Sequence, residues 1–230
     1  MYKIPKIIHQ TWKDNQIPYP LDQVVKTWQE MLPDWEYHLW TDEKNREFVK
    51  TNFPDFLSLY DAYPNKIQRA DAIRYLLLKT YGGLYIDLDF ECLDPKVTTL
   101  LEGAKFVAGK EPYWHAQRFG KDYIVCNAFM ASVPDNDFLN FVCDFMMHAG
   151  GRTVANGFDI LNTTGPFMLT NAYKAYPRKE SVRILEPDLI YPIGQWEVEK
   201  IKQNRISSEM AERINHAYAI HYFIGSWYGG

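Results

Sequence analysis

The spacing of apolar and polar positions predicts alternating strands and helices in the first part of the chain. Residues 6–12 (KIIHQTW) are mostly apolar and follow a proline, which is typical of a buried strand. Leu21 to Met31 has helical spacing, residues 35–40 (WEYHLW) alternate as a strand does, and Asp42 is suited to cap a helix ending near Asn52. This alternation predicts a mainly parallel sheet flanked by helices, with ligands bound beyond the carboxyl ends of its strands.

The next predicted helix, from about Asn65 to Tyr81, carries charges on a face that we expect to be buried. It is apolar almost all round from Ile73 to Leu78, and such a helix belongs in a core. Asp71 and Arg74 are three residues apart and therefore share a face of this helix. Buried charges must be paired or bound to a ligand, so the two residues form either an internal ion pair or part of a binding site.

An acidic segment follows this helix directly. Gly82 and Gly83 end the helix, and residues 84–91 (LYIDLDFE) are expected to form one strand with Tyr85, Asp87, Asp89 and Glu91 on a single face. Asp87 and Asp89 would then lie roughly 7 Å apart. Their repulsion calls for a cation, and a divalent metal is the simplest one, although a solvated strand face or a tight turn is the alternative. An EF-hand loop is excluded because Cys92 stands where that loop requires glycine.

The remainder of the chain continues the mixed pattern. Further strands are expected at residues 105–109, 123–132, 182–185, 189–193 and 217–223, and further helices at residues 135–149 and 166–176.

Composition indicates one α/β domain that spans residues 1–230, because 230 residues with 47% apolar content can build one stable core. A net charge of −4 argues against a nucleic-acid partner. Three scattered cysteines predict buried free thiols and a reducing compartment. With no signal peptide and no apolar run long enough to span a bilayer, we expect a cytoplasmic protein with at most peripheral association at the inner face of the membrane.

Three blocks of the sequence together resemble family 32 glycosyltransferases. They are residues 4–12 (IPKIIHQTW), residues 69–75 (RADAIRY) with residues 81–89 (YGGLYIDLD), and residues 221–227 (HYFIGSW). This DXD-containing group includes mannosyltransferases, α1,4-galactosyltransferases and capsular polysaccharide enzymes, and it is related to the catalytic domains of clostridial glucosylating toxins. The resemblance spans nearly the whole chain, and the blocks occur in the family's order.

The resemblance implies a GT-A fold with a Rossmann-like sheet, a divalent metal cofactor (Mn²⁺ or Mg²⁺) and a retaining hexosyltransferase. The donor would be a nucleotide sugar, with a UDP-sugar favoured over GDP-mannose, and the acceptor an oligosaccharide or lipid-linked glycan. Because no extra carboxylate in the sequence is marked as a nucleophile, we favour front-face attack over a covalent intermediate.

The resemblance also assigns residues. Asp87, Asp89 and His221 would bind the metal, whereas a core histidine is the other interpretation of His221. Asp71 and Arg74 would act on the donor sugar and its phosphates as catalytic residues together with Asp87 and Asp89.

The rest of the donor site is assigned in the same way. Trp12 would stack on the nucleotide base or belong to the core, Tyr85 and Asn127 would lie near the donor, and Ser226 with Trp227 would close over the diphosphate. Glu91 is expected to lie past the metal. A nucleotide-sugar hydrolase or phosphoesterase, and a carbohydrate-binding protein without activity, remain alternatives.

Overall fold

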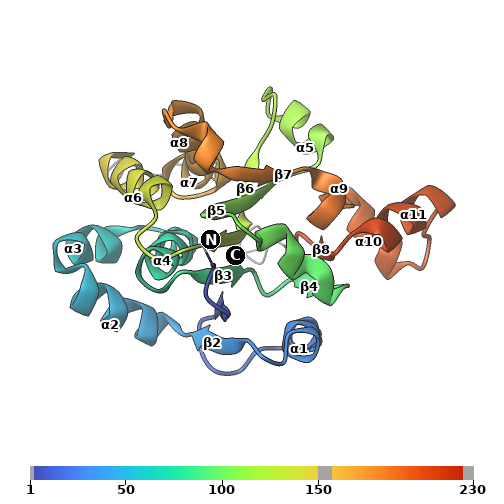
Figure 1. Ribbon diagram of the computed structural model, residues 1–230, viewed down its shortest axis with the longest axis horizontal. Coiled ribbons are helices and arrows are strands. Elements are labelled where there is room, and N and C mark those ends of the chain that lie inside the picture. Colours follow the sequence, from blue (N-terminus) through green and yellow to red (C-terminus); the bar gives the residue numbers. More distant parts are fainter. Residues whose placement is uncertain (1–2, 150–156, 225–230) are drawn as a thin grey trace.

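The computed structural model describes residues 3–149 and 157–224, and a six-stranded sheet runs through its centre (Figure 1). The strand order is β2-β1-β3-β6-β5-β7. Strand β6 is antiparallel to both of its neighbours and the other pairs are parallel, so the sheet is mainly parallel as predicted. The strands are β1 (Ile7–Thr11), β2 (Glu36–Trp40), β3 (Gly83–Ile86), β5 (Phe106–Lys110), β6 (Val125–Ser132) and β7 (Arg183–Leu185).

Helices cover both faces of this sheet. Successive side chains of each strand point to opposite faces, so the sheet separates two apolar cores. One core contains Tyr85 of β3 and is closed by α2 (Asp42–Asn52), α3 (Pro54–Ala62), α4 (Lys66–Tyr81), α6 (Asp137–Ala149) and α8 (Pro166–Ala175). The other contains Leu84 and Ile86 of the same strand and is closed by α1 (Leu21–Met31), the 3₁₀ segment η1 (Pro95–Leu101) and α9 (Pro187–Ile190).

The remaining elements lie around these layers. They are the two-stranded sheet of β4 (Phe90–Cys92) and β8 (Ala219–His221), and the helices α5 (Tyr113–Arg118), α7 (Gly157–Thr163), α10 (Gln195–Lys202), α11 (Ser208–His216) and η2 (Lys179–Ser181).

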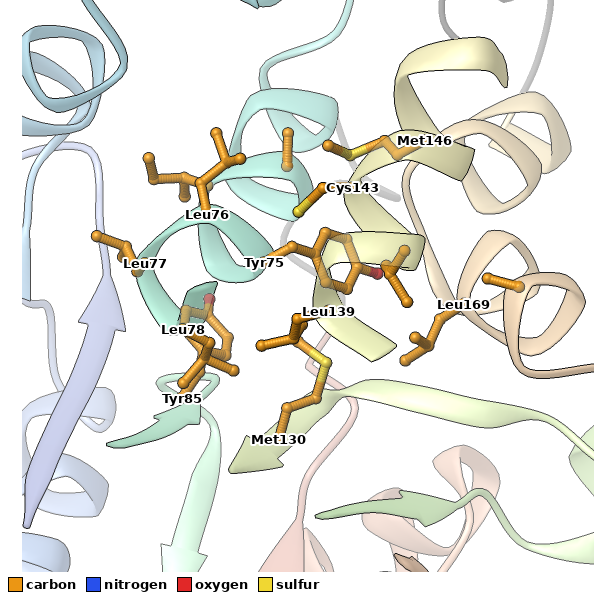
Figure 2. Packing of buried hydrophobic residues seen from close by; sticks show 14 of the residues in the cluster. Tyr75, Leu76, Leu77, Leu78, Tyr85, Met130, Leu139, Cys143, Met146 and Leu169 are labelled. Carbon is orange, nitrogen blue, oxygen red and sulfur yellow. The ribbon is translucent and has the colours of Figure 1, made fainter. Parts of the chain in front are cut away.

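Helix α4 is the buried helix that the sequence predicted. Asn65 caps its start by accepting the N–H of Ile67 at 3.0 Å, and Gly82 follows its end with a positive φ of 66°. Figure 2 shows Tyr75, Leu76, Leu77 and Leu78 of α4 surrounded by side chains of the sheet, α6 and α8. A helix that contacts neighbours on nearly every side holds its few polar groups in fixed positions.

Three local predictions were wrong. Residues 84–91 do not form one strand, because β3 ends at Ile86 and the N–H of Phe90 turns back to the carbonyl of Asp87 at 3.1 Å. Residues 189–193 do not form a strand, because Pro187 begins the short helix α9. Thr41, not Asp42, caps α2 by accepting the N–H of Lys44.

Helices α3, α5, α7, α10 and α11 were not predicted from the sequence. The three cysteines are buried and free, as predicted. Across residues 3–149 and 157–224, no helix is both long enough and apolar enough to cross a membrane.

Candidate active site

The acidic segment is a tight turn at the carboxyl edge of the sheet. After β3 the N–H of Asp87 still bonds to the carbonyl of Ala128 on β6 at 2.9 Å, and the chain then turns into β4. Gln10, fully buried on β1, donates to the carbonyl oxygen of Asp87 at 3.3 Å. The backbone of Asp87 is thus held from two neighbouring strands.

This turn and the pairing of β4 with β8 bring His221 to the two aspartates. Phe90 lies opposite His221 in the β4–β8 ladder, and their rings stack with centroids 5.0 Å apart. One ligand atom from each of Asp87, Asp89 and His221 lies within 4.8 Å of the others, and Nε2 of His221 is 3.1 Å from Oδ1 of Asp89. The three predicted metal ligands are therefore together, although a turn rather than a strand face brings the aspartates to them.

The chemistry of this group fits a divalent metal. Two carboxylates and an imidazole are donors that Mn²⁺ accepts. The second oxygen of Asp89 accepts the N–H of Ile224 at 2.7 Å, which fixes the carboxylate with its other oxygen toward His221. Arg74 pairs with Asp71 and Asp87, and His221 pairs with Asp89, so a divalent cation would add positive charge where the carboxylates of Asp87 and Asp89 lie close together.

The pKa values of these three groups are shifted both by burial and by the charged groups beside them. Burial raises the pKa of the Asp87 carboxyl, Arg74 opposes this increase, and Asp89 adds to it. Burial also acts to raise the pKa of Asp89, but His221 beside it holds that pKa below its usual value. For His221, burial lowers the pKa and the neighbouring Asp89 outweighs it, so the net shift is upward.

Arg74 connects the buried face of α4 to the acidic turn. Its guanidinium lies 3.0 Å from Asp71 and 3.2 Å from Asp87, and it donates to the main-chain oxygen of Asn127 at 2.9 Å. It also lies over the ring of Tyr85, 4.8 Å from the centroid. Burial alone would lower the pKa of Arg74, yet the surrounding groups, Asp87 first, raise it well above its ordinary value, so the side chain stays charged.

Asp71 is the other half of this pair, and its exposed fraction is 5%. Its two oxygens accept from the Asn127 amide at 3.0 Å and from the Thr164 hydroxyl at 3.1 Å. Burial is the main reason that the pKa of Asp71 is raised, and Arg74 opposes the increase. The i, i+3 ion pair of the sequence analysis exists, but it is one contact of a larger network that includes Asp87.

The structure adds Thr164 and Tyr75 to the site residues. The hydroxyl of Tyr75 receives the second N–H of the Asn127 amide at 3.0 Å and donates to the carbonyl of Thr164 at 2.9 Å. No role was assigned to Thr164 or Tyr75 from the sequence. Thr164 lies 93 positions from Asp71, which leaves no local signal of their contact.

Trp12 and Tyr85 also lie at the turn. Trp12 is partly buried and packs against a small apolar cluster of Leu21, Val25 and Leu88. Leu88 is the residue between the two aspartates, so this cluster places Trp12 beside the acidic turn. The Tyr85 hydroxyl lies 3.0 Å from Asp87 and 3.1 Å from the hydroxyl of Thr11. The remaining predicted residues, Ser226 and Trp227, lie outside the described part of the chain.

Glu91 is not part of this group, and its carboxylate accepts a hydrogen bond from the hydroxyl of Tyr222.

Comparison with known proteins supports the resemblance seen in the sequence. Residues 18–107 match the family described as "Glycosyltransferase sugar-binding region containing DXD motif". The mannosyl phosphorylinositol ceramide synthase SUR1 of Saccharomyces cerevisiae is 37% identical over 189 residues, which cover 80% of this chain and 47% of that protein. Inositol phosphoceramide mannosyltransferase 3 of Schizosaccharomyces pombe is 55% identical over 95 residues, covering 40% of this chain and 27% of the relative. The chain spans about half or less of the length of these two relatives.

Solved structures of low sequence identity share the fold. The PaToxG glycosyltransferase superimposes with a TM-score of 0.55 and 18% identity, covering 94% of this chain and 89% of that one. The galactosyltransferase LgtC gives a TM-score of 0.50 and 15% identity, with 94% and 87% covered. The GT-A fold expected from the sequence is thereby confirmed.

Proposed function

This chain belongs to the DXD-containing glycosyltransferases, and we propose that it transfers mannose from GDP-mannose to a hydroxyl of an inositol or sugar ring on a lipid-linked acceptor. The sequence alone favoured a UDP-sugar. The names of the similar yeast proteins describe mannosyltransferases acting on inositol phosphoceramide, and they support GDP-mannose and a lipid headgroup instead. A lipid-linked acceptor also accords with peripheral association at a membrane.

The donor is proposed to lie along the carboxyl edge of the sheet. Trp12, at the end of β1, would stack on the guanine base, and Tyr85 would keep Asp87 oriented for the nucleotide. Asp71 and Asn127 are already joined by a hydrogen bond and would face the sugar hydroxyls. Arg74 would bind the sugar or its phosphate through its planar guanidinium, and Ser226 with Trp227 would close over the diphosphate.

Asp87, Asp89 and His221 would hold Mn²⁺ or Mg²⁺. Bound there, the metal would stabilise the negative charge that develops on the diphosphate as it leaves. The protein's own part is to hold two carboxylates and an imidazole within reach of one ion before the donor arrives. The backbone N–H of Ile224 and the ladder between β4 and β8 supply that rigidity.

Retention of configuration is proposed to occur by attack on the same face as the leaving group. The acceptor hydroxyl would bond to the anomeric carbon while the bond to the diphosphate breaks, and its proton would pass to the departing phosphate oxygen. A covalent intermediate would require a free carboxylate nucleophile. Asp71 is a poor candidate, because its two oxygens already accept hydrogen bonds from Asn127 and Thr164 and contact Arg74.

The observation that carries the proposal is the convergence of the three metal-binding side chains with the Asp71–Arg74 pair in one network. It can be tested by incubating the protein with Mn²⁺ and a panel of GDP- and UDP-sugars, with and without myo-inositol 1-phosphate, and measuring nucleotide release. Release from GDP-mannose that increases with the acceptor is expected. Release that no acceptor changes would indicate a hydrolase, and absence of release from every donor would indicate a binding protein.

A further inference from the structure

Three exposed aromatic side chains lie on the helices α5 and α10, which are joined by the hydrogen bond from the N–H of Gln195 to His115. Tyr113 and Trp114 on α5 are 61% and 36% exposed, and Trp196 on α10 is 44% exposed. The indole rings of the two tryptophans lie with centroids 6.0 Å apart. We call Tyr113, Trp114 and Trp196 the aromatic surface, and such grouped, exposed rings are informative because large aromatic side chains are normally buried or in contact with a partner.

Ring contacts connect this surface to the metal site. Trp196 contacts His115 with centroids 5.1 Å apart, His115 contacts Phe223 at 4.7 Å, and Phe223 contacts His221 at 4.2 Å. The contacts lead from solvent to the proposed metal ligand without a break. The aromatic surface is thus connected to the proposed metal ligand His221 through two intervening rings, those of His115 and Phe223.

The topology places this surface on the side of the site opposite the proposed base position. Strands β1, β3 and β5 run in the same direction, since β6 is antiparallel to both β3 and β5. Trp12, Asp87 and the start of α5 consequently follow strands that end at one edge of the sheet, in the strand order β1, β3, β6, β5. The donor would occupy the β1–β3 side, which leaves the β5 side for the second substrate.

The aromatic surface is held rigidly in place. Nδ1 of His115 lies 2.9 Å from Glu111, and its Nε2 accepts the N–H of Gln195 at 3.1 Å, so this ring is fixed between α5 and α10. Gly194 leaves the space that the Trp114 indole fills, because a Cβ at position 194 would lie 2.4 Å from Nε1 of that ring. Fixed rings lose little entropy when a ligand stacks on them.

We propose that the aromatic surface binds the ring of the acceptor, a hexose or inositol, by stacking against its C–H face and directing a hydroxyl toward the metal site. The proposal rests on the proposed function, since it names the substrate of that same site. A polyol ring has one apolar face and hydroxyls at its rim, so a fixed indole beside a polar site matches both parts. Contact with a bilayer is the competing use of exposed Trp and Tyr.

The test compares Trp196→Ala and Trp114→Ala with wild type in Mn²⁺ and saturating GDP-mannose, with methyl α-mannoside and myo-inositol 1-phosphate as soluble acceptors. Each variant is expected to raise the acceptor KM about tenfold. Nucleotide release without acceptor should not change. Trp196→Tyr, which keeps a flat ring, should recover most of the loss. Ile206→Ala, an exposed apolar residue between α10 and α11, is the control and should keep the wild-type KM.

Several results would overturn the proposal. An unchanged acceptor KM in both alanine variants would do so, and so would an equal loss of acceptor-independent release. Loss of binding to phosphatidylcholine vesicles with an unchanged KM would assign the rings to the bilayer. If wild type transfers nothing, the proposed function fails, and saturation-transfer NMR of the two acceptors on wild type and Trp196→Ala still decides the inference: ring-proton signals that only wild type shows support it, and equal or absent signals overturn it.

Discussion

Replacing Arg74 by alanine should both destabilise the fold and impair use of the donor. The guanidinium, 4% exposed, contacts Asp71 and Asp87 at 3.0 and 3.2 Å. Removing one partner of a buried ion pair typically costs 3–5 kcal/mol, because the remaining charge has no counterion. Asp71 would keep the donors of Asn127 and Thr164, and Asp87 is partly exposed, so we expect a loss near the lower limit, about 3 kcal/mol.

Urea and thermal unfolding measure this loss. For a chain of this length about 3 kcal/mol corresponds to a decrease in melting temperature of roughly 6–12 °C. Arg46→Ala is the matched control, because it breaks a two-pronged arginine pair with Asp61 that lies at the surface, and it should leave stability close to that of wild type. Arg74→Lys should recover part of the stability but not donor use, since an ammonium lacks the planar fork.

The outcomes separate structure from function. Wild-type stability in Arg74→Ala would refute the buried network. If Arg74→Ala loses the expected stability, about 3 kcal/mol, but keeps wild-type nucleotide release, the network is structural only and Arg74 does not act on the donor.

Other predictions concern the supports of the site. Thr164→Val removes the hydroxyl that holds Asp71 and should lower kcat roughly 10- to 100-fold; wild-type kinetics would show that Asp71 is positioned without it. Burial lowers the pKa of His9 from 6.5 to about 4, so the unfolded chain takes up the proton first as the pH falls. The fold should therefore lose about 2 kcal/mol between pH 7 and pH 5, and urea unfolding of His9→Gln should show a shallower pH dependence, whereas an identical slope would exclude His9 as the cause. Gly82→Ala puts a Cβ 2.7 Å from the carbonyl oxygen of Ser132 and should lower the melting temperature more than Gly103→Ala, which has a similar φ but open space around it; equal losses would contradict the close contact.

Local signals were sufficient to predict much of the fold. The start of α4 was predictable because Asn65 is a good capping residue, and its end because two glycines follow it. Its burial followed from apolar residues on every side. The parallel strands β1 and β2 were evident from their composition and from the helix between them.

The predictions that were wrong concerned segments whose structure the local sequence pattern does not determine. The alternation of residues 84–91 is equally compatible with one strand and with two short strands joined by a turn. The arrangement with two short strands is stabilised by β8, a strand near the other end of the sequence, which pairs with β4. The four-residue apolar segment of α9 likewise cannot be distinguished from a buried strand by its periodicity.

The site shows the same division. Asp71 and Arg74 stood out because charges on an apolar helix face need a partner, and the resemblance added Asp87, Asp89 and His221. Thr164 and Tyr75 were missed, because a threonine in a turn and a tyrosine in a core helix are ordinary by themselves. The roles of Trp12, Asn127, Ser226 and Trp227, and the cytoplasmic location, stay predictions.

Metal binding by Asp87, Asp89 and His221 is the central claim, and it can be measured without turnover. Titrating Mn²⁺ into the protein with GDP and following free Mn²⁺ by electron paramagnetic resonance should show one bound ion in wild type. Asp89→Asn and His221→Ala should weaken binding by roughly tenfold or more. Glu91→Gln, whose carboxylate faces Tyr222, should bind as wild type does. Absence of Mn²⁺ binding in wild type, or unchanged binding in Asp89→Asn and His221→Ala, would contradict the assignment.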